Sequence, residues 1–217
     1  MRRGEASDYI KYNRARLAEL LEIVAMDGED AENLASKLAD RCSGIDGLFV
    51  TPEDELAEIL SPDGVTFIRL VAAITSRRLR EGFKFGEPRS QYEICEYLKA
   101  VFLCEASECV MVIPLDERGA PLCCELASSG TVNASDIAAR GIAEIALTRG
   151  VRRVIVAHNH PRGIAKPSDE DKATTKALVA SLHRAGVELA YHVIVAGQEC
   201  DIIEISDFVC DESKGQK

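Results

Sequence analysis

Residues 151–186 read VRRVIVAHNHPRGIAKPSDEDKATTKALVASLHRAG and contain three segments of different character. The apolar run over 151–157 predicts a short buried strand, and the proline- and glycine-containing stretch after it predicts a loop. Ser168 is a typical N-cap residue, so we expect a long helix from there to about Ala185, which Gly186 ends. A strand, a loop and a helix in this order indicate an α/β or α+β domain.

The segments on both sides extend this alternation from residue 91 onward. Helices are expected over 92–104 and 135–148, and strands over 109–115, 121–127 and 187–196. The second part of the chain is therefore predicted to be an α/β sheet flanked by helices.

The first part of the chain shows helical periodicity instead. Apolar residues recur at helical spacing over 12–24 and 31–39, and an apolar helix is expected over 65–79, after the turn signal at 61–64. These patterns indicate a small all-α domain. The predicted division is 1–84 for the helical domain, 85–90 for a linker, 91–213 for the α/β domain and 214–217 for a tail.

Charge and hydropathy argue against a non-specific nucleic-acid-binding protein and against a membrane protein. The 217 residues include 26 Lys and Arg against 36 Asp and Glu, which gives a formal net charge of −10. Such a chain lacks the broad positive field that non-specific nucleic-acid binding usually needs. Its apolar runs stay well below the roughly 20 residues of a membrane span, and its first residues contain no hydrophobic signal core. We therefore expect a cytoplasmic protein without a membrane partner.

Eight cysteines are spread along the chain without any Cys-x-x-Cys pair. This spacing does not indicate a zinc ribbon or a thioredoxin-like site, and the chain is too long for a small secreted disulfide framework. Most of the cysteines lie in apolar stretches, such as Val-Phe-Leu-Cys at 101–104. We expect them to be small, reduced core residues.

The two histidines directly after the predicted strand carry the strongest chemical signal. Residues two apart in an extended chain point to the same side with Cα atoms about 6.6 Å apart, so His158 and His160 can converge on one ion at bond lengths of about 2.0–2.1 Å. Asp171, on the first turn of the predicted helix, supplies a third ligand. Each part alone has a structural explanation, because Ser168 and Asp171 also form an ordinary helix cap. Together, two imidazoles and a carboxylate with a fourth position open are typical of a catalytic zinc site.

The complete spacing, which is His-x-His, seven residues and Ser-x-x-Asp, resembles the signature of the JAB1/MPN/Mov34 (JAMM) metalloenzymes. His-Asn-His-Pro-x-Gly at 158–163, Pro-Ser-x-x-Asp at 167–171 and Ser-Gly-Thr at 129–131 are similar to its bacterial RadC-like branch. The resemblance covers about residues 91–208. It implies the MPN fold, a cytidine-deaminase-like sheet flanked by helices.

The resemblance also implies roles for individual residues. His158, His160 and Asp171 would bind Zn²⁺, and Ser168 would donate a hydrogen bond to the oxyanion or to the bound water. Glu125, on the earlier predicted strand, would exchange protons with that water as the general acid–base. The implied activity is hydrolysis of peptide or isopeptide bonds in a protein or peptide substrate by metal-activated water.

Two segments depart from the family pattern. The later strand reads Tyr191-His192 where the RadC-like branch commonly has Asp-His, so we expect His192 to be satisfied by ordinary hydrogen bonds. The first part resembles a degenerate helix-hairpin-helix module, in which Ser-Pro-Asp-Gly at 61–64 replaces the glycine-rich, phosphate-binding turn. Residues 1–90 also hold 13 basic against 17 acidic residues, which gives DNA binding little support.

Two alternatives to a peptidase stay open at this point. One is a RadC-like DNA-repair-associated protein or metal-dependent nuclease, and the other is a non-catalytic MPN scaffold that binds a protein partner. All the ligand positions of the JAMM pattern are filled, which favours an enzyme over a scaffold. An acidic chain repels phosphodiesters, which favours a peptidase over a nuclease.

Overall fold

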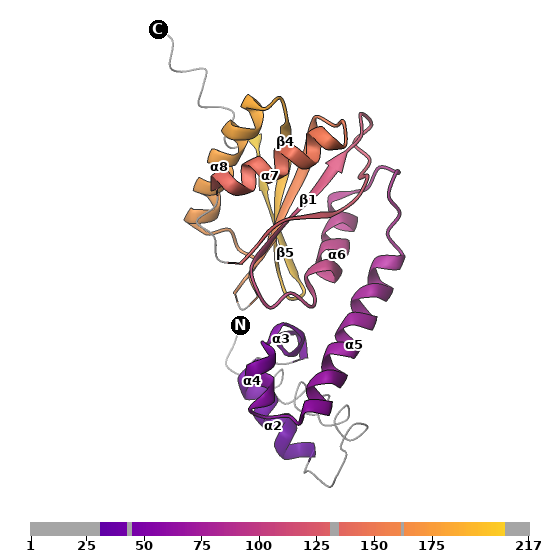
Figure 1. Cartoon of the computed structure of the whole chain (residues 1–217), viewed down its shortest axis with the longest axis vertical. Coiled ribbons are helices and arrows are strands. Elements are labelled where there is room, and N and C mark those ends of the chain that lie inside the picture. Colours follow the sequence, from indigo (N-terminus) through magenta and orange to yellow (C-terminus); the bar gives the residue numbers. More distant parts are fainter. Residues whose placement is uncertain (1–30, 43–44, 131–134, 162, 207–217) are drawn as a thin grey trace, which may run out of the picture. The chain divides into compact units, whose positions relative to one another are not determined.

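The computed structural model describes residues 31–42, 45–130, 135–161 and 163–206 (Figure 1). The chain forms two compact units, and the boundary between them falls after Arg78, with Leu103–Ala106 belonging to the first unit. The predicted helix over 12–24 and the predicted tail lie outside the described residues. None of the described helices combines the length and the apolar character that crossing a membrane requires.

The first unit is helical, as the sequence predicts. Its described elements are α2 (Ala31–Cys42), α3 (Ile45–Val50), α4 (Glu53–Ala57) and α5 (Pro62–Glu81). Leu38, Leu48 and Leu56 come from three of these helices and are almost fully buried in one cluster. This cluster gives the unit a small hydrophobic core of its own.

Helix α5 begins three residues earlier than predicted. Pro62 occupies its first position, where the missing N–H is tolerated, and Ser61 Oγ accepts a hydrogen bond from Gly64 N–H at 3.2 Å. The four residues predicted to form a turn are thus the N-cap and the first turn of a helix.

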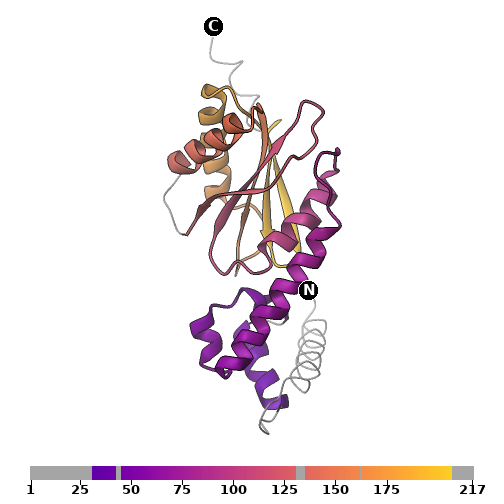
Figure 2. The same cartoon turned by 45° about the vertical axis from the view of Figure 1, so that its right-hand side comes forward.

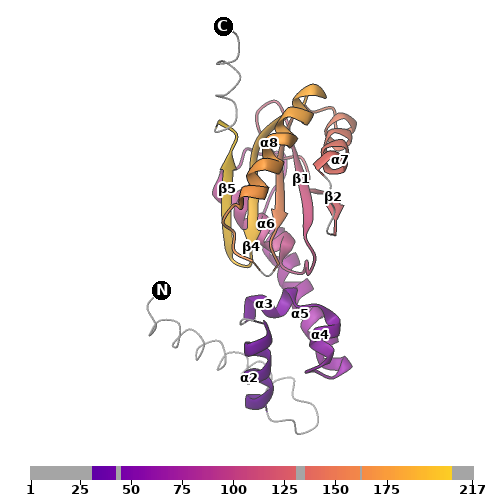
Figure 3. The same cartoon turned by 90° about the vertical axis from the view of Figure 1, so that its left-hand side faces the viewer.

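The second unit is a five-stranded sheet with helices on both faces. Its elements are α6 (Gln91–Phe102), β1 (Cys109–Leu115), β2 (Glu125–Ser129), α7 (Ser135–Thr148), β3 (Arg153–Asn159), α8 (Asp169–Arg184), β4 (Glu188–Ala196) and β5 (Glu199–Glu204). The strand order is β2-β1-β3-β4-β5, and Figure 3 shows β2 and β5 at opposite edges. Strands β3 and β4 are parallel, whereas the other neighbouring pairs are antiparallel. This mixed sheet preceded by helices confirms the predicted fold class.

Helix α6 covers one face of the sheet, and α7 and α8 cover the other (Figure 2). Ile94 and Leu98 of α6 pack with Ile113 of β1 on the first face. Ile142 of α7 and Leu182 of α8 belong to a second cluster on the opposite face. The central strands β1, β3 and β4 are therefore buried on both sides, as their continuous apolar runs predict.

Two strands differ from the prediction. Strand β2 covers Glu125–Ser129 instead of 121–127, and Pro121 forms only an isolated bridge with Leu115. Strand β5 is missing from the prediction because its sequence, ECDIIE, lies at an edge and lacks a strong apolar alternation. It follows β4 through a two-residue turn in which Gly197 has a φ of +55°.

Cys95 of α6 and Cys200 of β5 form a disulfide, with Cα atoms 6.1 Å apart. The prediction of reduced thiols is wrong for this pair, because a separation of 105 residues leaves no local sign that the two cysteines meet. Cys42 and Cys109 are buried and lie outside any disulfide, as expected of core thiols.

Candidate metal centre

The end of β3 places His158 and His160 beside the start of α8. Strand β3 is held between β1 and β4. His158 has the same strand parity as Val154 and Val156, which pack under α7 and α8, so its side chain belongs to that face. His160 follows the last residue of the strand, and its N–H still donates to the carbonyl of Val195 at 2.8 Å. Both histidines are thus carried by a backbone that the sheet fixes.

Asn159, between the two histidines, ties the end of β3 to the start of β1. Its side-chain Oδ1 accepts a hydrogen bond from Cys109 N–H at 2.8 Å, and its Nδ2 donates to the Ser107 carbonyl at 3.1 Å. Asn159 is only 2% exposed. These two bonds, the first buried and the second partly buried, hold the histidine-bearing segment from the opposite face of the strand.

The N-terminus of α8 orients the carboxylate of Asp171. Ser168 is the N-cap and accepts a hydrogen bond from Asp171 N–H at 3.0 Å. In return, Asp171 Oδ2 accepts from Ser168 N–H at 2.7 Å and from Ser168 Oγ–H at 2.6 Å. The predicted cap is therefore a complete capping box. The same contacts that start the helix also fix the position of the predicted metal ligand.

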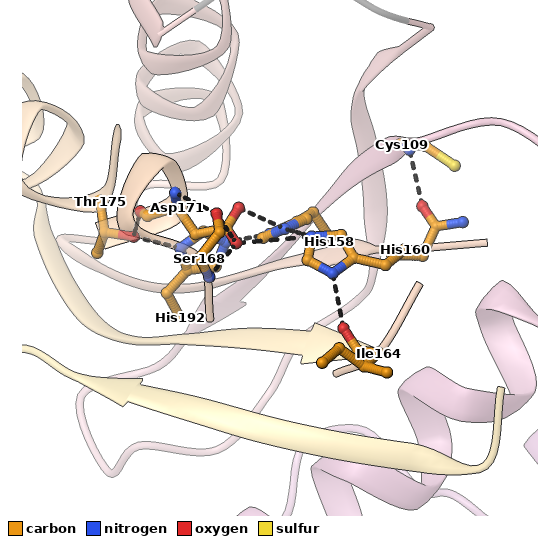
Figure 4. Close-up of polar contacts among 9 residues, drawn as sticks. Cys109, His158, His160, Ile164, Ser168, Asp171, Thr175 and His192 are labelled. Atoms are coloured by element: carbon orange, nitrogen blue, oxygen red, sulfur yellow. Dashed lines mark hydrogen bonds and ion pairs between the residues drawn. The ribbon is translucent and has the colours of Figure 1, made fainter. Parts of the chain in front are cut away.

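His158, His160 and Asp171 meet at one point (Figure 4). One ligand atom from each lies within 4.8 Å of the others. His158 Nε2 is 2.9 Å from His160 Nε2 and 3.1 Å from Asp171 Oδ1, and His160 Nε2 is 3.6 Å from Asp171 Oδ2. Their side chains are between 13% and 19% exposed, so the cluster is largely shielded from water but still reachable.

The second nitrogen of each ring also has a partner. His160 Nδ1 donates to the carbonyl of Ile164 at 2.9 Å, because a carbonyl can only accept. His158 Nδ1 lies 2.9 Å from Nε2 of His192, and His192 Nδ1 lies 2.7 Å from Thr175 Oγ1. Figure 4 shows these contacts running from β3 through β4 to α8. Such partners orient a ligating imidazole and fix its tautomer.

Burial keeps the two inner rings, His158 and His192, neutral. Burial lowers the pKa of His158 to about 4 and that of His192 to about 3, while the charge of Asp171 acts in the opposite direction. For Asp171 itself, burial acts to raise the pKa, but the hydrogen bonds from Ser168 and the two histidines of the cluster outweigh it. The pKa of Asp171 therefore lies below its ordinary value, and near neutral pH the carboxylate is ionised.

The chemistry of this donor set fits a divalent metal ion. Two imidazole nitrogens and one carboxylate oxygen are the mixed set that zinc prefers. Atoms bound at about 2.0–2.1 Å to one tetrahedral ion lie about 3.3 Å apart. The two Nε2 atoms are 2.9 Å apart, and the nearest carboxylate contacts are 3.1 Å to Oδ1 for His158 and 3.6 Å to Oδ2 for His160, so the donor atoms lie close to that spacing. Since His160 Nδ1 carries the proton of its ring, its Nε2 presents a lone pair to the cluster. A cation is the natural occupant of such a position.

Glu125, the predicted general base, does not belong to the cluster. In register it pairs with Val112, which pairs in turn with Val156, so Glu125 and His158 emerge on the same face of the sheet. Its Oε1, however, accepts hydrogen bonds from Arg149 at 2.9 Å and from Cys123 at 3.1 Å. The bonds from Cys123 and Arg149 hold the pKa of Glu125 below its ordinary value.

Three residues that support the cluster lie outside the predicted set of site residues. His192 was expected only to be satisfied by ordinary hydrogen bonds, and its side-chain contacts join it to His158 and Thr175. Thr175 bonds to His192, and Asn159 pins the end of β3. Only Thr175 carries a local signal, because it lies one helical turn after Asp171 on the same face. The other two depend on strand pairing.

Comparison with known proteins matches residues 88–203 to the family described as the RadC-like JAB domain. This range contains every residue of the cluster and of its supporting contacts.

Similar proteins extend over most of the chain. A UPF0758 protein of Methylibium petroleiphilum is 32% identical over 188 residues, which cover 84% of this chain and 83% of that protein. A UPF0758 protein of a Janthinobacterium species is 30% identical over 197 residues, 87% of this chain and 88% of the relative. A third, from Pseudoalteromonas translucida, is 29% identical over 192 residues, with 84% of each chain covered.

Proposed function

This chain belongs to the RadC-like JAB domain family, and from that premise we propose that it is a zinc-dependent hydrolase of peptide or isopeptide bonds. The observation that supports the proposal most directly is the convergence of His158, His160 and Asp171 within 4.8 Å. Two of these side chains come from the end of a strand and the third from a helix start ten residues later, so the arrangement is not a by-product of one local structure.

In this proposal the three residues hold the ion, and other residues act on the substrate. A bound zinc ion would act as a Lewis acid and lower the pKa of a bound water molecule to near 7. Ser168 Oγ lies at the N-terminus of α8, where helix N–H groups favour a developing negative charge. The Ser168 hydroxyl donates to the Asp171 carboxylate in this structure. We propose that the same hydroxyl donates to the oxyanion during the reaction.

Glu125 remains the general base of the proposal and must leave Arg149 to act. The pair is at the surface, with side chains 33% and 48% exposed for Glu125 and Arg149. An exposed ion pair of this kind contributes only about 0–1 kcal/mol. Rotation of the carboxylate would break this ion pair and the hydrogen bond from the Cys123 thiol, which is a weak donor, so its cost is small. Glu125 already emerges on the face that carries His158.

The charge around the cluster favours a peptide over a phosphodiester. Asp169 and Glu170, on the exposed first turn of α8, directly precede the proposed ligand Asp171, and Asp169 lies 3.8 Å from the ammonium group of Lys172. A polyanionic strand would approach three consecutive carboxylates in a chain of net charge −10. Coulomb repulsion would oppose that approach, whereas a neutral peptide meets no such barrier.

Metal content and cleavage together test the proposal. The purified full chain should contain close to one equivalent of zinc, and His158→Ala and Asp171→Ala should remove it. His183→Ala is the matched control, since His183 is exposed near the end of α8. Cleavage is scored by mass spectrometry on a proteome-derived peptide library supplemented with peptides joined through a lysine isopeptide bond.

The outcomes separate the metal site from the reaction. Glu125→Gln should keep the zinc and lose cleavage. Zinc binding without cleavage of any library peptide would overturn the hydrolase and favour the scaffold. Absence of bound zinc in the unmodified chain would overturn both the metal centre and the activity.

A further inference from the structure

Two buried polar side chains outside the ligand set connect two of the ligands. Thr175 of α8 is fully buried, and His192 of β4 is 4% exposed. Buried polar groups of this kind are hydrogen-bonded in native proteins, and the identity of their partners shows what they hold in place. Here the partners are His158 on one side and the backbone of Asp171 on the other.

The hydroxyl of Thr175 settles where every proton in this chain of contacts lies. Thr175 Oγ1 is 2.6 Å from the Asp171 carbonyl and 2.7 Å from His192 Nδ1. The hydroxyl has one proton, and the carbonyl can only accept, so that proton is directed to Asp171. His192 Nδ1 must then be the donor to Thr175 Oγ1, since two lone pairs facing each other at 2.7 Å would repel.

The assignment propagates to the ligand. A neutral imidazole with a proton on Nδ1 has a lone pair on Nε2, so His192 Nε2 accepts from His158 Nδ1–H. His158 Nε2 is then left with its lone pair, which faces the lone pair of His160 Nε2 at 2.9 Å and Asp171 Oδ1 at 3.1 Å. These three groups repel one another unless a cation lies between them, so this tautomer suits a bound metal ion. A metal ion requires this tautomer of His158.

We propose that Thr175 and His192 are positioning residues that set His158 in its metal-binding tautomer. They act through three hydrogen bonds in sequence: His158 Nδ1–H donates to His192 Nε2, His192 Nδ1–H donates to Thr175 Oγ1, and Thr175 Oγ1–H donates to the Asp171 carbonyl. The inference rests on the metal centre of the proposed function. It adds a link between two of the proposed ligands, because the contacts that begin at His158 end on the backbone of Asp171, whose carboxylate is itself a proposed ligand. His158, His192, Thr175 and Asp171 thus form a closed ring of contacts (Figure 4).

Removing the Thr175 hydroxyl should reverse the direction of the hydrogen bonds around this ring of contacts. Without an acceptor for its Nδ1–H, His192 gains by moving the proton to Nε2 and donating to His158 Nδ1. His158 would then carry its proton on Nε2 and donate it to Asp171 Oδ1, which lies 3.1 Å away. Metal binding would have to undo this tautomer first.

The experiment compares Thr175→Val with Thr175→Ser in the full chain. Thr66→Val is the matched control, because Thr66 Oγ1 donates to the carbonyl four residues back in α5, just as Thr175 Oγ1 does in α8. Thr175→Ala is a second removal in case the valine disturbs packing. The chain has four histidines, so ring ¹⁵N long-range NMR spectra of metal-free protein resolve the tautomer of each.

The expected result has two parts. Unmodified protein, Thr175→Ser and Thr66→Val should show the Nδ1–H tautomer at His158, and Thr175→Val and Thr175→Ala should lose it. Zinc affinity, measured by competition with a chelator, should fall about 10–100-fold in those two variants alone.

An unchanged tautomer and an unchanged zinc affinity in Thr175→Val and Thr175→Ala would overturn the inference while leaving the metal centre intact. If the unmodified chain binds no zinc, the proposed function fails, and the ring spectra still decide whether Thr175 sets the tautomer.

Discussion

Replacing Asn159 with alanine should weaken the sheet and the metal centre together. The side chain makes a buried hydrogen bond from Cys109 N–H and a partly buried one to the Ser107 carbonyl. Both connect the end of β3 to the segment that leads into β1. Because Asn159 separates the two histidines of the cluster, loosening it frees the backbone that carries them.

The size of the effect follows from these contacts. A buried hydrogen bond contributes about 0.5–1.5 kcal/mol net, and taking the acceptor away from a buried donor costs about 1–3 kcal/mol. Asn159 is 2% exposed, so bulk water does not readily replace its amide. We expect Asn159→Ala to lower the free energy of unfolding of the second unit by about 2–4 kcal/mol.

The assay must report on the second unit alone, since the chain has two compact units. Native-state hydrogen exchange at the amides of β1 and β3 meets this need, and zinc affinity is measured on the same samples. Gln91→Ala is the control, because Gln91 Nε2 makes a comparable bond to Glu204, but at the surface. That substitution should change stability by less than about 0.5 kcal/mol.

The reasoning fails if Asn159→Ala behaves like Gln91→Ala. Exchange rates in β1 and β3 within a factor of about five of the unmodified protein would correspond to less than about 1 kcal/mol. Unchanged zinc affinity together with a large loss of stability would refute only the link between the strand end and the ligands.

Three further predictions concern protonation, redox state and capping. Burial lowers the pKa of His158 to about 4 and of His192 to about 3, so below pH 6.5 the unfolded metal-free chain binds more protons than the folded chain. The free energy of unfolding, measured by urea denaturation, should therefore fall as the pH drops from 6.5 to 5, by up to about 1.4 kcal/mol per pH unit for each histidine. A flat profile would contradict this. Reducing the Cys95–Cys200 disulfide should cost about 2–4 kcal/mol, so dithiothreitol should lower the melting temperature of the unmodified protein and leave a Cys95→Ala variant unaffected. Ser168→Ala should cost about 1 kcal/mol through the lost N-cap, and a thermal melt without any decrease would show that the cap contributes nothing.

The regular elements around the cluster were predictable because their signals are local. Ser168 begins α8 as its capping pattern predicts, and the helix predicted over 135–148 is α7. The convergence of His158, His160 and Asp171 was predictable for the same reason, since the three residues lie within 14 residues on one strand end and one helix start. When the loop between two elements is short, the spacing of residues along the sequence is enough to predict which side chains meet.

Features that depend on distant segments could not be predicted in the same way. The partner of Glu125 is Arg149, which follows α7, and the partner of Cys95 is on the last strand. No periodicity in either segment indicates the other. The sequence shows that Glu125 carries a charge, but its ion pair with Arg149 depends on how α7 packs against β2.

The tautomer of His158 depends on strand register, which explains why the role of His192 escaped prediction. In the parallel pairing of β3 and β4, His192 lies opposite Val156, two residues before His158, and shares the face under α8. A register irregularity between Val154 and Val156 precedes this pairing. Since neighbouring residues in a strand point to opposite faces, a shift of one residue there would turn His192 toward α6 and away from Thr175. Every ligand would remain in place, yet His158 would lose the contact that we propose keeps its Nε2 free for a metal.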